Sequence, residues 1–249
     1  MKKLKGGIIA AMFLVSLLVV INPVSATVWH VYPGDSIQAA IDNASSGDTI
    51  YVHAGTYHER LIIRRSLSLV GEGMRVTTIL GDSETVIDVS GVTVNISGFT
   101  IWSGLNDVIY YQYGASGTIR NNDIGLCVYS AIHNYLSSPI IENNVISEGG
   151  KAILNEFSNP LISNNHISAG GGIYNINSSP TIIDNRISVT SRDGIYNESS
   201  SPRIIHNTII PYPVGASGGD NGIYNVDSSP IITDNTIEDY RDNGIYNVN

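Results

Sequence analysis

A repeat of about 20 residues in the second half of the chain constrains the fold more than any other feature of the sequence. Five blocks share a proline, at least two aliphatic residues, an asparagine and an isoleucine: SSPIIENNVIS, SNPLISNNHIS, SSPTIIDNRIS, SSPRIIHNTII and SSPIITDNTIE. Their prolines are Pro139, Pro160, Pro180, Pro202 and Pro230, at intervals of 21, 20, 22 and 28 residues. A recurring period of this length is typical of a solenoid, in which each repeat forms one turn.

A second block alternates with the first. It reads AIHN from Ala131, AILN from Ala152, and then GIYN from Gly172, Gly194, Gly222 and Gly244. Every apolar segment is short and bounded by glycine, proline or asparagine, which excludes helical repeats. Three short strands per repeat describe a coil whose turns stack in parallel about 4.8 Å apart. The sequence therefore predicts an all-β fold, a right-handed, single-stranded parallel β-helix with three strands per turn.

Matching positions of successive turns should form columns of side chains. Three aliphatic columns are expected to fill the interior, where each buried side chain contributes about 1.5–3 kcal/mol. The first holds Ile132, Ile153, Ile173, Ile195, Ile223 and Ile245; the second Ile141, Ile162, Ile183 and Ile205; and the third Ile124, Ile146, Ile167, Ile187, Ile209 and Ile237.

A fourth column consists of asparagines at the corner before the third strand: Asn122, Asn144, Asn165, Asn185, Asn207 and Asn235. We expect their amides to bond to one another and to the turn backbone. The residue before each of them is asparagine, aspartate or histidine, and these types tolerate a left-handed backbone best.

Only one corner of the coil varies in length. It is short at Gly149-Gly150 and Gly170-Gly171, and longest at residues 211–221. In repeat proteins, one-sided insertions often mark the binding side. A column beside this corner holds Tyr174, Tyr196, Tyr224 and Tyr246, with His133 in the same position of an earlier turn. Strand alternation should point these rings outward, where they either stack on sugar rings or pack on one another.

Residues 1–26 have the features of an export signal. Lys2, Lys3 and Lys5 precede an apolar run over residues 8–21, and small residues end the segment at Ala26. Removing it takes away three lysines and no acidic residue, so the formal charge changes from −9 to −12. An acidic chain lacks the basic patches that nucleic acids and anionic membranes require. We therefore expect an exported protein, extracellular, on the cell surface or periplasmic, with no nucleic-acid partner and no membrane insertion after cleavage.

The remaining residues, 27–249, should form one β-helix domain. An N-terminal cap at about residues 27–48 contains a short helix, with Asp35 or Ser36 at its start and Ile37 and Ile41 on its apolar face. Regular repeats cover about residues 108–249. The last repeat has no cap, so we expect a further domain or subunit at that end, because open strand edges invite association.

The N-terminal part carries a family resemblance. The segments PGDSIQAAI, GDTIYVHAGTYHE and LSLVGEGMRVTTIL resemble the opening turns of pectin-lyase-like right-handed β-helix proteins, in particular pectinesterases and the NosD group. The NNxI and GIY blocks are similar to the CASH type of β-helix repeat. The resemblance implies this fold and the processing or binding of carbohydrate, since the scaffold hosts lyases, hydrolases, esterases, adhesins and surface proteins.

The sequence contains no motif that identifies a catalytic site. The Asp-Asp, Gly-His-Gly and Arg-x-Lys motifs of polygalacturonase-type enzymes are missing, and Lys151 is the only lysine after the signal. Stacked turns could bring together Asp193, Asp220 and Asp242, the paired carboxylates that a glycosidase needs. The NosD resemblance directs attention to His53, His58 and Glu59 as copper ligands, with surface residues of a turn as the alternative.

The leading hypothesis is a secreted or surface protein, not an enzyme, that binds carbohydrate or another surface polymer through its tyrosine column and adjacent loops. The first alternative is a lyase or hydrolase acting on an acidic polysaccharide. The second is a NosD-like periplasmic accessory protein for metal insertion. No cofactor is predicted for the leading hypothesis; Ca²⁺ or Cu²⁺ would be bound only under the two alternative functions.

Four Asn-x-Ser/Thr triplets, at Asn43, Asn95, Asn177 and Asn197, are candidate glycan acceptors.

Overall fold

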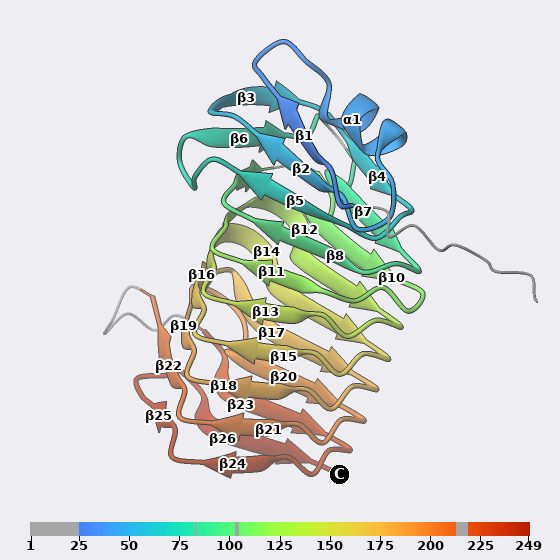
Figure 1. The fold of residues 1–249 in the computed structure, drawn as a ribbon. Helices are drawn as coiled ribbons and strands as arrows, with labels where there is room; N and C mark the ends of the chain where they lie inside the picture. The colour runs from blue at the N-terminus through green and yellow to red at the C-terminus, as the bar shows by residue number, and fades with distance from the viewer. Residues whose placement is uncertain (1–24, 83, 103–104, 213–218) are drawn as a thin grey trace, which may run out of the picture.

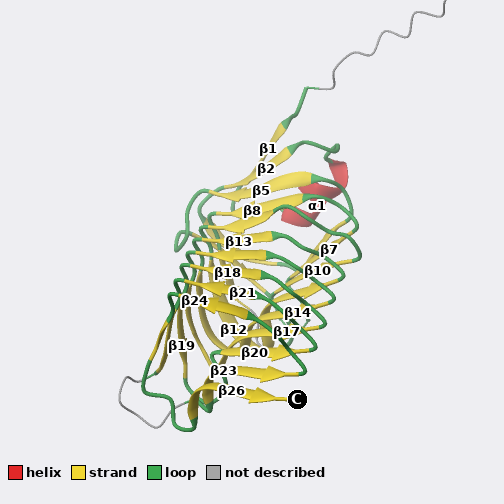
Figure 2. Ribbon diagram, turned by 90° about the horizontal axis from the view of Figure 1, so that it is seen from below, coloured by secondary structure: helices red, strands yellow, loops and turns green. Residues whose placement is uncertain are grey.

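The computed structural model describes residues 25–249 except 83, 103–104 and 213–218, so most of the predicted export signal lies outside the described residues. The chain winds into a tall coil of stacked turns, with one helix at the N-terminal end (Figures 1 and 2). The strands pair in parallel, each with the strand one turn before and one turn after it. The prediction of a parallel β-helix is confirmed.

One wall of the coil is a 10-stranded sheet that faces the viewer in Figure 1. In spatial order its strands are β1 (Val28–Val31), β2 (Thr49–Val52), β5 (Leu67–Gly71), β8 (Val94–Ser97), β11 (Thr118–Arg120), β13 (Ile140–Glu142), β15 (Leu161–Ser163), β18 (Thr181–Ile183), β21 (Arg203–Ile205) and β24 (Ile231–Thr233).

The other two walls form one 16-stranded sheet, because β12 (Asp123–Tyr135) and β14 (Val145–Glu156) run around the corner between them. The wall that follows the 10-stranded sheet along the chain also holds β3 (Gly55–His58), β6 (Thr77–Leu80), β9 (Thr100–Trp102), β16 (His166–Ala169), β19 (Arg186–Val189), β22 (Thr208–Pro211) and β25 (Thr236–Ile237). The last wall also holds β4 (Leu61–Ile63), β7 (Ile87–Ser90), β10 (Ile109–Gln112), β17 (Gly171–Ile176), β20 (Ile195–Glu198), β23 (Asn221–Val226) and β26 (Asn243–Val248).

The helix α1 (Ile37–Asn43) covers the N-terminal end of the coil, as predicted. Ser36 is its N-cap, and the Ser36 side chain accepts a hydrogen bond from the backbone N–H of Ala39. Ile37 and Ile41 are buried and belong to the hydrophobic core of the coil. The cap therefore shields the first turn of the interior from water.

The interior consists of the aliphatic columns. The first and third columns have the predicted register, as the pairs Ile153–Ile173 and Ile167–Ile187 show. The second column was partly wrong. Its members are Ile119, Ile141, Ile162, Ile182, Ile204 and Ile232. Ile183 and Ile205 are only half-buried, because the inward position is two residues after the proline and not three, and strand alternation turns the next side chain outward.

The predicted asparagine column is confirmed, and we call it the outer asparagine ladder: Asn122, Asn144, Asn165, Asn185, Asn207 and Asn235. Asn165 shows the pattern. Its Nδ2 donates to Asn185 Oδ1 and to the Ile141 carbonyl, and its backbone N–H also donates to Asn185 Oδ1. The ladder thus satisfies backbone groups that a buried turn would otherwise leave unpaired.

The residue before each member of this ladder has a left-handed backbone, with φ between 53° and 57°, as predicted. These residues are Asn121, Asn143, Asn164, Asp184, His206 and Asp234. A second asparagine ladder, which was not predicted from the sequence, is formed by Asn134, Asn155, Asn175, Asn197, Asn225 and Asn247. The constant last letter of the AIHN, AILN and GIYN blocks was the signal for it.

Candidate functional site

The tyrosine column (Tyr174, Tyr196, Tyr224 and Tyr246) lies on the outer side of β17, β20, β23 and β26. Neighbouring ring centroids are 5.3, 5.5 and 5.3 Å apart along the column. Neighbouring rings cover one another, so the tyrosines are less exposed than isolated outward-pointing side chains would be. Tyr174 is 8% exposed, and Tyr246 at the end of the column is 44% exposed. The expectation of exposed rings was therefore wrong for Tyr174, although all four rings form one continuous row of contacts, stacked between Tyr174 and Tyr196 and edge-on between Tyr196 and Tyr224.

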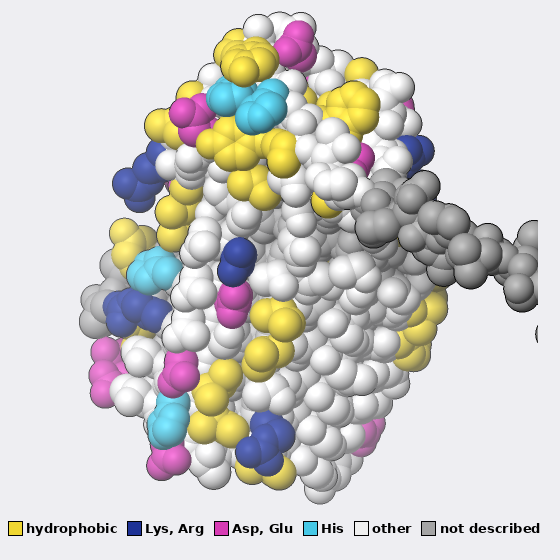
Figure 3. Space-filling view, viewed as in Figure 1, with side chains coloured by type: hydrophobic (Ala, Val, Ile, Leu, Met, Phe, Trp, Pro, Cys, Tyr) yellow, Lys and Arg dark blue, Asp and Glu magenta, His cyan; other side chains and the backbone are white. Residues whose placement is uncertain are grey.

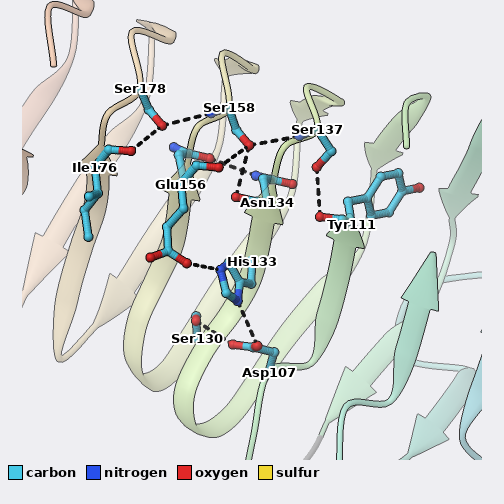
Figure 4. A network of polar contacts seen from close by, with 11 residues as sticks. Asp107, Tyr111, Ser130, His133, Asn134, Ser137, Glu156, Ser158, Ile176 and Ser178 are labelled. Carbon is cyan, nitrogen blue, oxygen red and sulfur yellow. Dashed lines mark hydrogen bonds and ion pairs between the residues drawn. The ribbon is translucent and has the colours of Figure 1, made fainter. Parts of the chain in front are cut away.

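His133 stands in the same column one turn before Leu154, and it is also buried, at 8% exposure. Its Nδ1 is 3.0 Å from Asp107 Oδ2, and its Nε2 is 2.7 Å from Glu156 Oε2 (Figure 4). Ser130 Oγ donates to the other oxygen of Asp107 at 2.6 Å. His133 therefore joins three turns through buried polar contacts. Its side chain is not exposed, so the prediction that it contacts a ligand at the surface was wrong.

Burial opposes protonation of His133, but the hydrogen bonds and charges of Asp107 and Glu156 outweigh it, so its pKa is raised above 6.5. Both ring nitrogens face carboxylate oxygens, and both can donate only when the ring is doubly protonated. The geometry thus favours an imidazolium held between two carboxylates.

A second column, two residues before the isoleucine of the first aliphatic column in each turn, changes its chemistry from turn to turn. We call it the variable column: Asp107, Ser130, Lys151, Gly171, Asp193, Asn221 and Asn243.

Lys151 Nζ lies 4.5 Å from the centre of the Tyr129 ring and 5.5 Å from that of Tyr174, in cation–π range. Burial, followed by the charge of Arg192, lowers the pKa of Lys151.

The three aspartates considered as catalytic candidates come together at the C-terminal end of this face. Asp193, Asp220 and Asp242 line one cleft of about 490 Å³. We call it the acidic cleft, and its other lining residues are Asn221, Tyr224, Arg241, Asn243 and Tyr246. Two rings of the tyrosine column therefore share a cleft with carboxylates and amides. Asn221, Asn243 and Arg241 were not predicted from the sequence as residues of this cleft, because their positions depend on the register of the variable column.

The three carboxylates have different surroundings. Asp193 is 8% exposed, and its Oδ1 accepts hydrogen bonds from the backbone N–H of Asn221 at 3.1 Å and from Asn221 Nδ2 at 2.8 Å. Burial raises the pKa of Asp193 despite these bonds. Asp220 and Asp242 are exposed or half-buried, and Arg241 binds both of them. The cleft thus contains one desolvated carboxyl group beside a group of one arginine and two aspartates.

The suggested copper ligands are not assembled in the expected way. Glu59 accepts hydrogen bonds from Ser36 Oγ and from the first backbone N–H groups of α1, at Ile37 and Gln38, so it is engaged in capping the helix. His58 lines a groove with Glu59 and Arg60. The side chain of His53 contacts His30 and Glu72 instead.

Burial separates the four candidate glycan acceptors. Asn43, Asn95 and Asn177 are exposed, whereas Asn197 is fully buried in the second asparagine ladder. Asn197 therefore cannot accept a glycan in the folded coil. Among the residues that the structure describes, no helix is both long and apolar enough to cross a membrane.

A family model described as the right handed beta helix region matches residues 85–249, which is more than half of the chain. The chain belongs to the right-handed beta helix family. The β-helix also extends upstream of that match, because β1 to β6 lie in the same two sheets as the later strands.

A cell surface glycoprotein of Methanothermus fervidus is 34% identical over 90 residues, which are 35% of this chain and 15% of that protein. Among solved structures, the PL6 family alginate lyase AlyGC aligns with 85% of this chain and 40% of its own, at 13% identity and a TM-score of 0.41. A pectin methylesterase from Aspergillus niger aligns with 90% of this chain and 84% of its own, at 16% identity and a TM-score of 0.40. At these identities the structural likeness concerns the fold alone.

Proposed function

We propose that this β-helix protein is located on the cell surface or outside the cell and binds carbohydrate in the acidic cleft. The observation that carries the proposal is the combination of Tyr224 and Tyr246 with Asp220, Asn221 and Asn243 in one open cleft. Aromatic rings provide an apolar face for a sugar ring, and the carboxylates and amides provide partners for its hydroxyl groups. The partial likeness to a cell surface glycoprotein supports the location.

The position of the cleft supports the same proposal. It lies where the tyrosine column and the variable column run side by side, next to the one corner that varies in length. Tyr196 and Tyr174 continue the aromatic stack away from the cleft, and Lys151 and Arg192 stand farther along the same face. A polymer chain that enters the cleft would therefore meet further aromatic and polar groups along the coil.

The test is a binding assay against a panel of neutral and acidic polysaccharides. The double variant Tyr224→Ala/Tyr246→Ala should bind at least about tenfold more weakly than the unmodified protein, because both rings line the cleft. Tyr113→Ala is the matched control, since Tyr113 is 60% exposed and lies at a different corner. Equal binding by the double variant and the control would contradict the proposed cleft.

The second candidate function is hydrolysis of a polysaccharide in the same cleft. The observation that favours it is the raised pKa of the buried Asp193 beside two further carboxylates. A carboxyl group with a raised pKa can act as a general acid, and a second carboxylate can then serve as base or nucleophile. A lyase would instead release unsaturated ends.

Product analysis separates catalysis from binding. An enzyme would release reducing or unsaturated ends from the polysaccharides that it binds, and Asp193→Asn would abolish that release. Asp193→Asn keeps the acceptor oxygen for Asn221 but removes the transferable proton. If bound polysaccharide is recovered intact from both proteins, the chain is a binding protein.

A further inference from the structure

Two histidines and two tyrosines form a partly exposed cluster at the N-terminal end of the 10-stranded sheet, far from the acidic cleft. They are His30 and Tyr32, on β1 and just after it, and Tyr51 and His53, on β2 and just after it. Figure 3 shows two histidine side chains side by side on this face, among hydrophobic side chains. We propose that His30 and His53 form a binding site for a divalent first-row transition metal.

The distance between the two rings fits this use. His30 Nδ1 lies 3.1 Å from His53 Nε2. A metal–nitrogen bond is about 2.0–2.1 Å long, so two nitrogen ligands at the angles of a square-planar or tetrahedral site are about 2.9–3.4 Å apart. The separation of these two nitrogens therefore matches that of two ligands of one metal ion, once the proton of their hydrogen bond has moved from Nδ1 to Nε2 of His30.

A carboxylate beside His53 favours the tautomer that a metal ligand needs. Glu72 Oε2 lies 3.4 Å from His53 Nδ1, and the same oxygen accepts a hydrogen bond from the backbone N–H of Ala54 at 2.8 Å. A proton on Nδ1 facing this carboxylate leaves the lone pair on Nε2, toward His30. Metal-binding histidines typically present their second nitrogen to a carboxylate in this way.

Two more contacts restrain His53, one at its ring and one at its backbone carbonyl. Tyr32 stacks on it with centroids 4.2 Å apart and an angle of 7° between the ring planes. Tyr57 donates a hydrogen bond from its hydroxyl group to the carbonyl of His53 at 2.9 Å. The ring is therefore positioned before any metal binds, and less conformational entropy is lost on binding.

The ligand types select the class of metal. Imidazole nitrogens suit Zn²⁺, Cu²⁺ and Ni²⁺, whereas Ca²⁺ and Mg²⁺ prefer oxygen. Within the described residues, no group of three or more histidine, cysteine, aspartate or glutamate residues is placed to hold a metal. The proposed site therefore has two protein ligands and leaves the other coordination positions open to exchangeable ligands such as water. This site does not depend on carbohydrate binding, and it replaces His58 and Glu59 by His30 as the partner of His53.

The experiment is a titration of the full exported chain with Zn²⁺, followed by calorimetry. One equivalent should bind. His30→Ala and His53→Ala should each weaken binding at least tenfold, and Glu72→Gln should weaken it by about tenfold. His58→Ala is the matched control and should bind as the unmodified protein does, because His58 lies in a different groove.

Electron paramagnetic resonance with Cu²⁺ supplies a readout that a general loss of structure would not mimic. The spectrum should show two imidazole nitrogens in the unmodified protein and fewer in His30→Ala. Unfolding midpoints measured without metal show whether each variant is folded; if an alanine variant is not, the matching glutamine variant replaces it. Undiminished binding by the folded His30 and His53 variants, or loss of binding in His58→Ala, would overturn the proposal.

Discussion

The outer asparagine ladder and the variable column belong to the same turns of the same coil, yet they differ in kind. The ladder repeats one residue six times, and in each of the first five members the backbone N–H and the side-chain Nδ2 both donate to Oδ1 of the next asparagine. The variable column changes from carboxylate to hydroxyl, amine, glycine and amide over seven turns. The ladder therefore fixes the register of the backbone. Within this fixed register, the variable column beside the tyrosines places a different chemical group at the same position of successive turns.

The largest expected effect comes from the interior that both columns share. Ile182 is fully buried in the second aliphatic column, so Ile182→Ala should lower the free energy of unfolding by about 4 kcal/mol. Its neighbour Ile183 is half-buried and points outward, so Ile183→Ala should cost less than about 1 kcal/mol. Urea denaturation of both variants measures the difference. Similar losses for the two would contradict the register described here.

A smaller but still large effect is expected in the outer asparagine ladder. Asn165→Ala removes five donor–acceptor contacts of the side chain and leaves the buried backbone N–H of Asn144 without its partner. Thermal or urea unfolding should show a loss of about 3 kcal/mol. The control is Asn164→Gly, which should be nearly neutral, because glycine accepts the φ of 55° at this exposed corner. A stable Asn165→Ala protein would mean that the ladder does not fix the register.

The effect of His133 depends on pH. Its pKa is raised in the folded chain, so the stability that its ion pairs contribute is fully present below about pH 6.5 and is lost as the pH rises through the folded pKa. The unfolding midpoint of the unmodified protein should therefore fall relative to that of His133→Gln when the pH is raised from 6 to 8. Parallel pH profiles for the two proteins would show that Asp107 and Glu156 do not hold an imidazolium.

The smallest expected effect on stability is that of Asp193→Asn, although this substitution should weaken the binding of polysaccharide. Burial raises the pKa of this carboxyl group, so its charged form disfavours folding once the pH is above about 3.8. Asp193→Asn removes that charge and should leave stability at pH 7 unchanged or raise it by less than about 1 kcal/mol. If the acidic cleft is functional, the same variant should bind polysaccharide more weakly. A substantial loss of stability would place Asp193 among the structural residues instead.

The residues that recur in every turn could be predicted from the sequence, whereas the contacts of the residues that vary from turn to turn could not. The asparagine ladder, the left-handed corners and two of the aliphatic columns follow from residues that recur at matching positions. The second column was misplaced beyond Ile162, because Thr181-Ile182-Ile183 offers two isoleucines and only the pairing of β15 with β18 decides between them. The helical cap followed from local capping and amphipathicity.

The candidate sites depend on contacts between turns that carry no local signal. The grouping of Asp193, Asp220 and Asp242 was anticipated from stacking, but the link from Arg241 to two of them was not. His133 was expected to be exposed, and its burial follows from Asp107 and Glu156, which lie 26 and 23 residues away along the chain. His30 and His53 likewise meet only because β1 pairs with β2.

Hydrogen–deuterium exchange, measured with and without a bound polysaccharide, locates the binding surface on the coil. Protection should increase at β23 and β26, which carry Tyr224 and Tyr246, and stay unchanged at the outer asparagine ladder. Protection confined to the ladder corner or to the N-terminal cap, with β23 and β26 unaffected, would contradict the placement of the binding surface on the variable side of the coil.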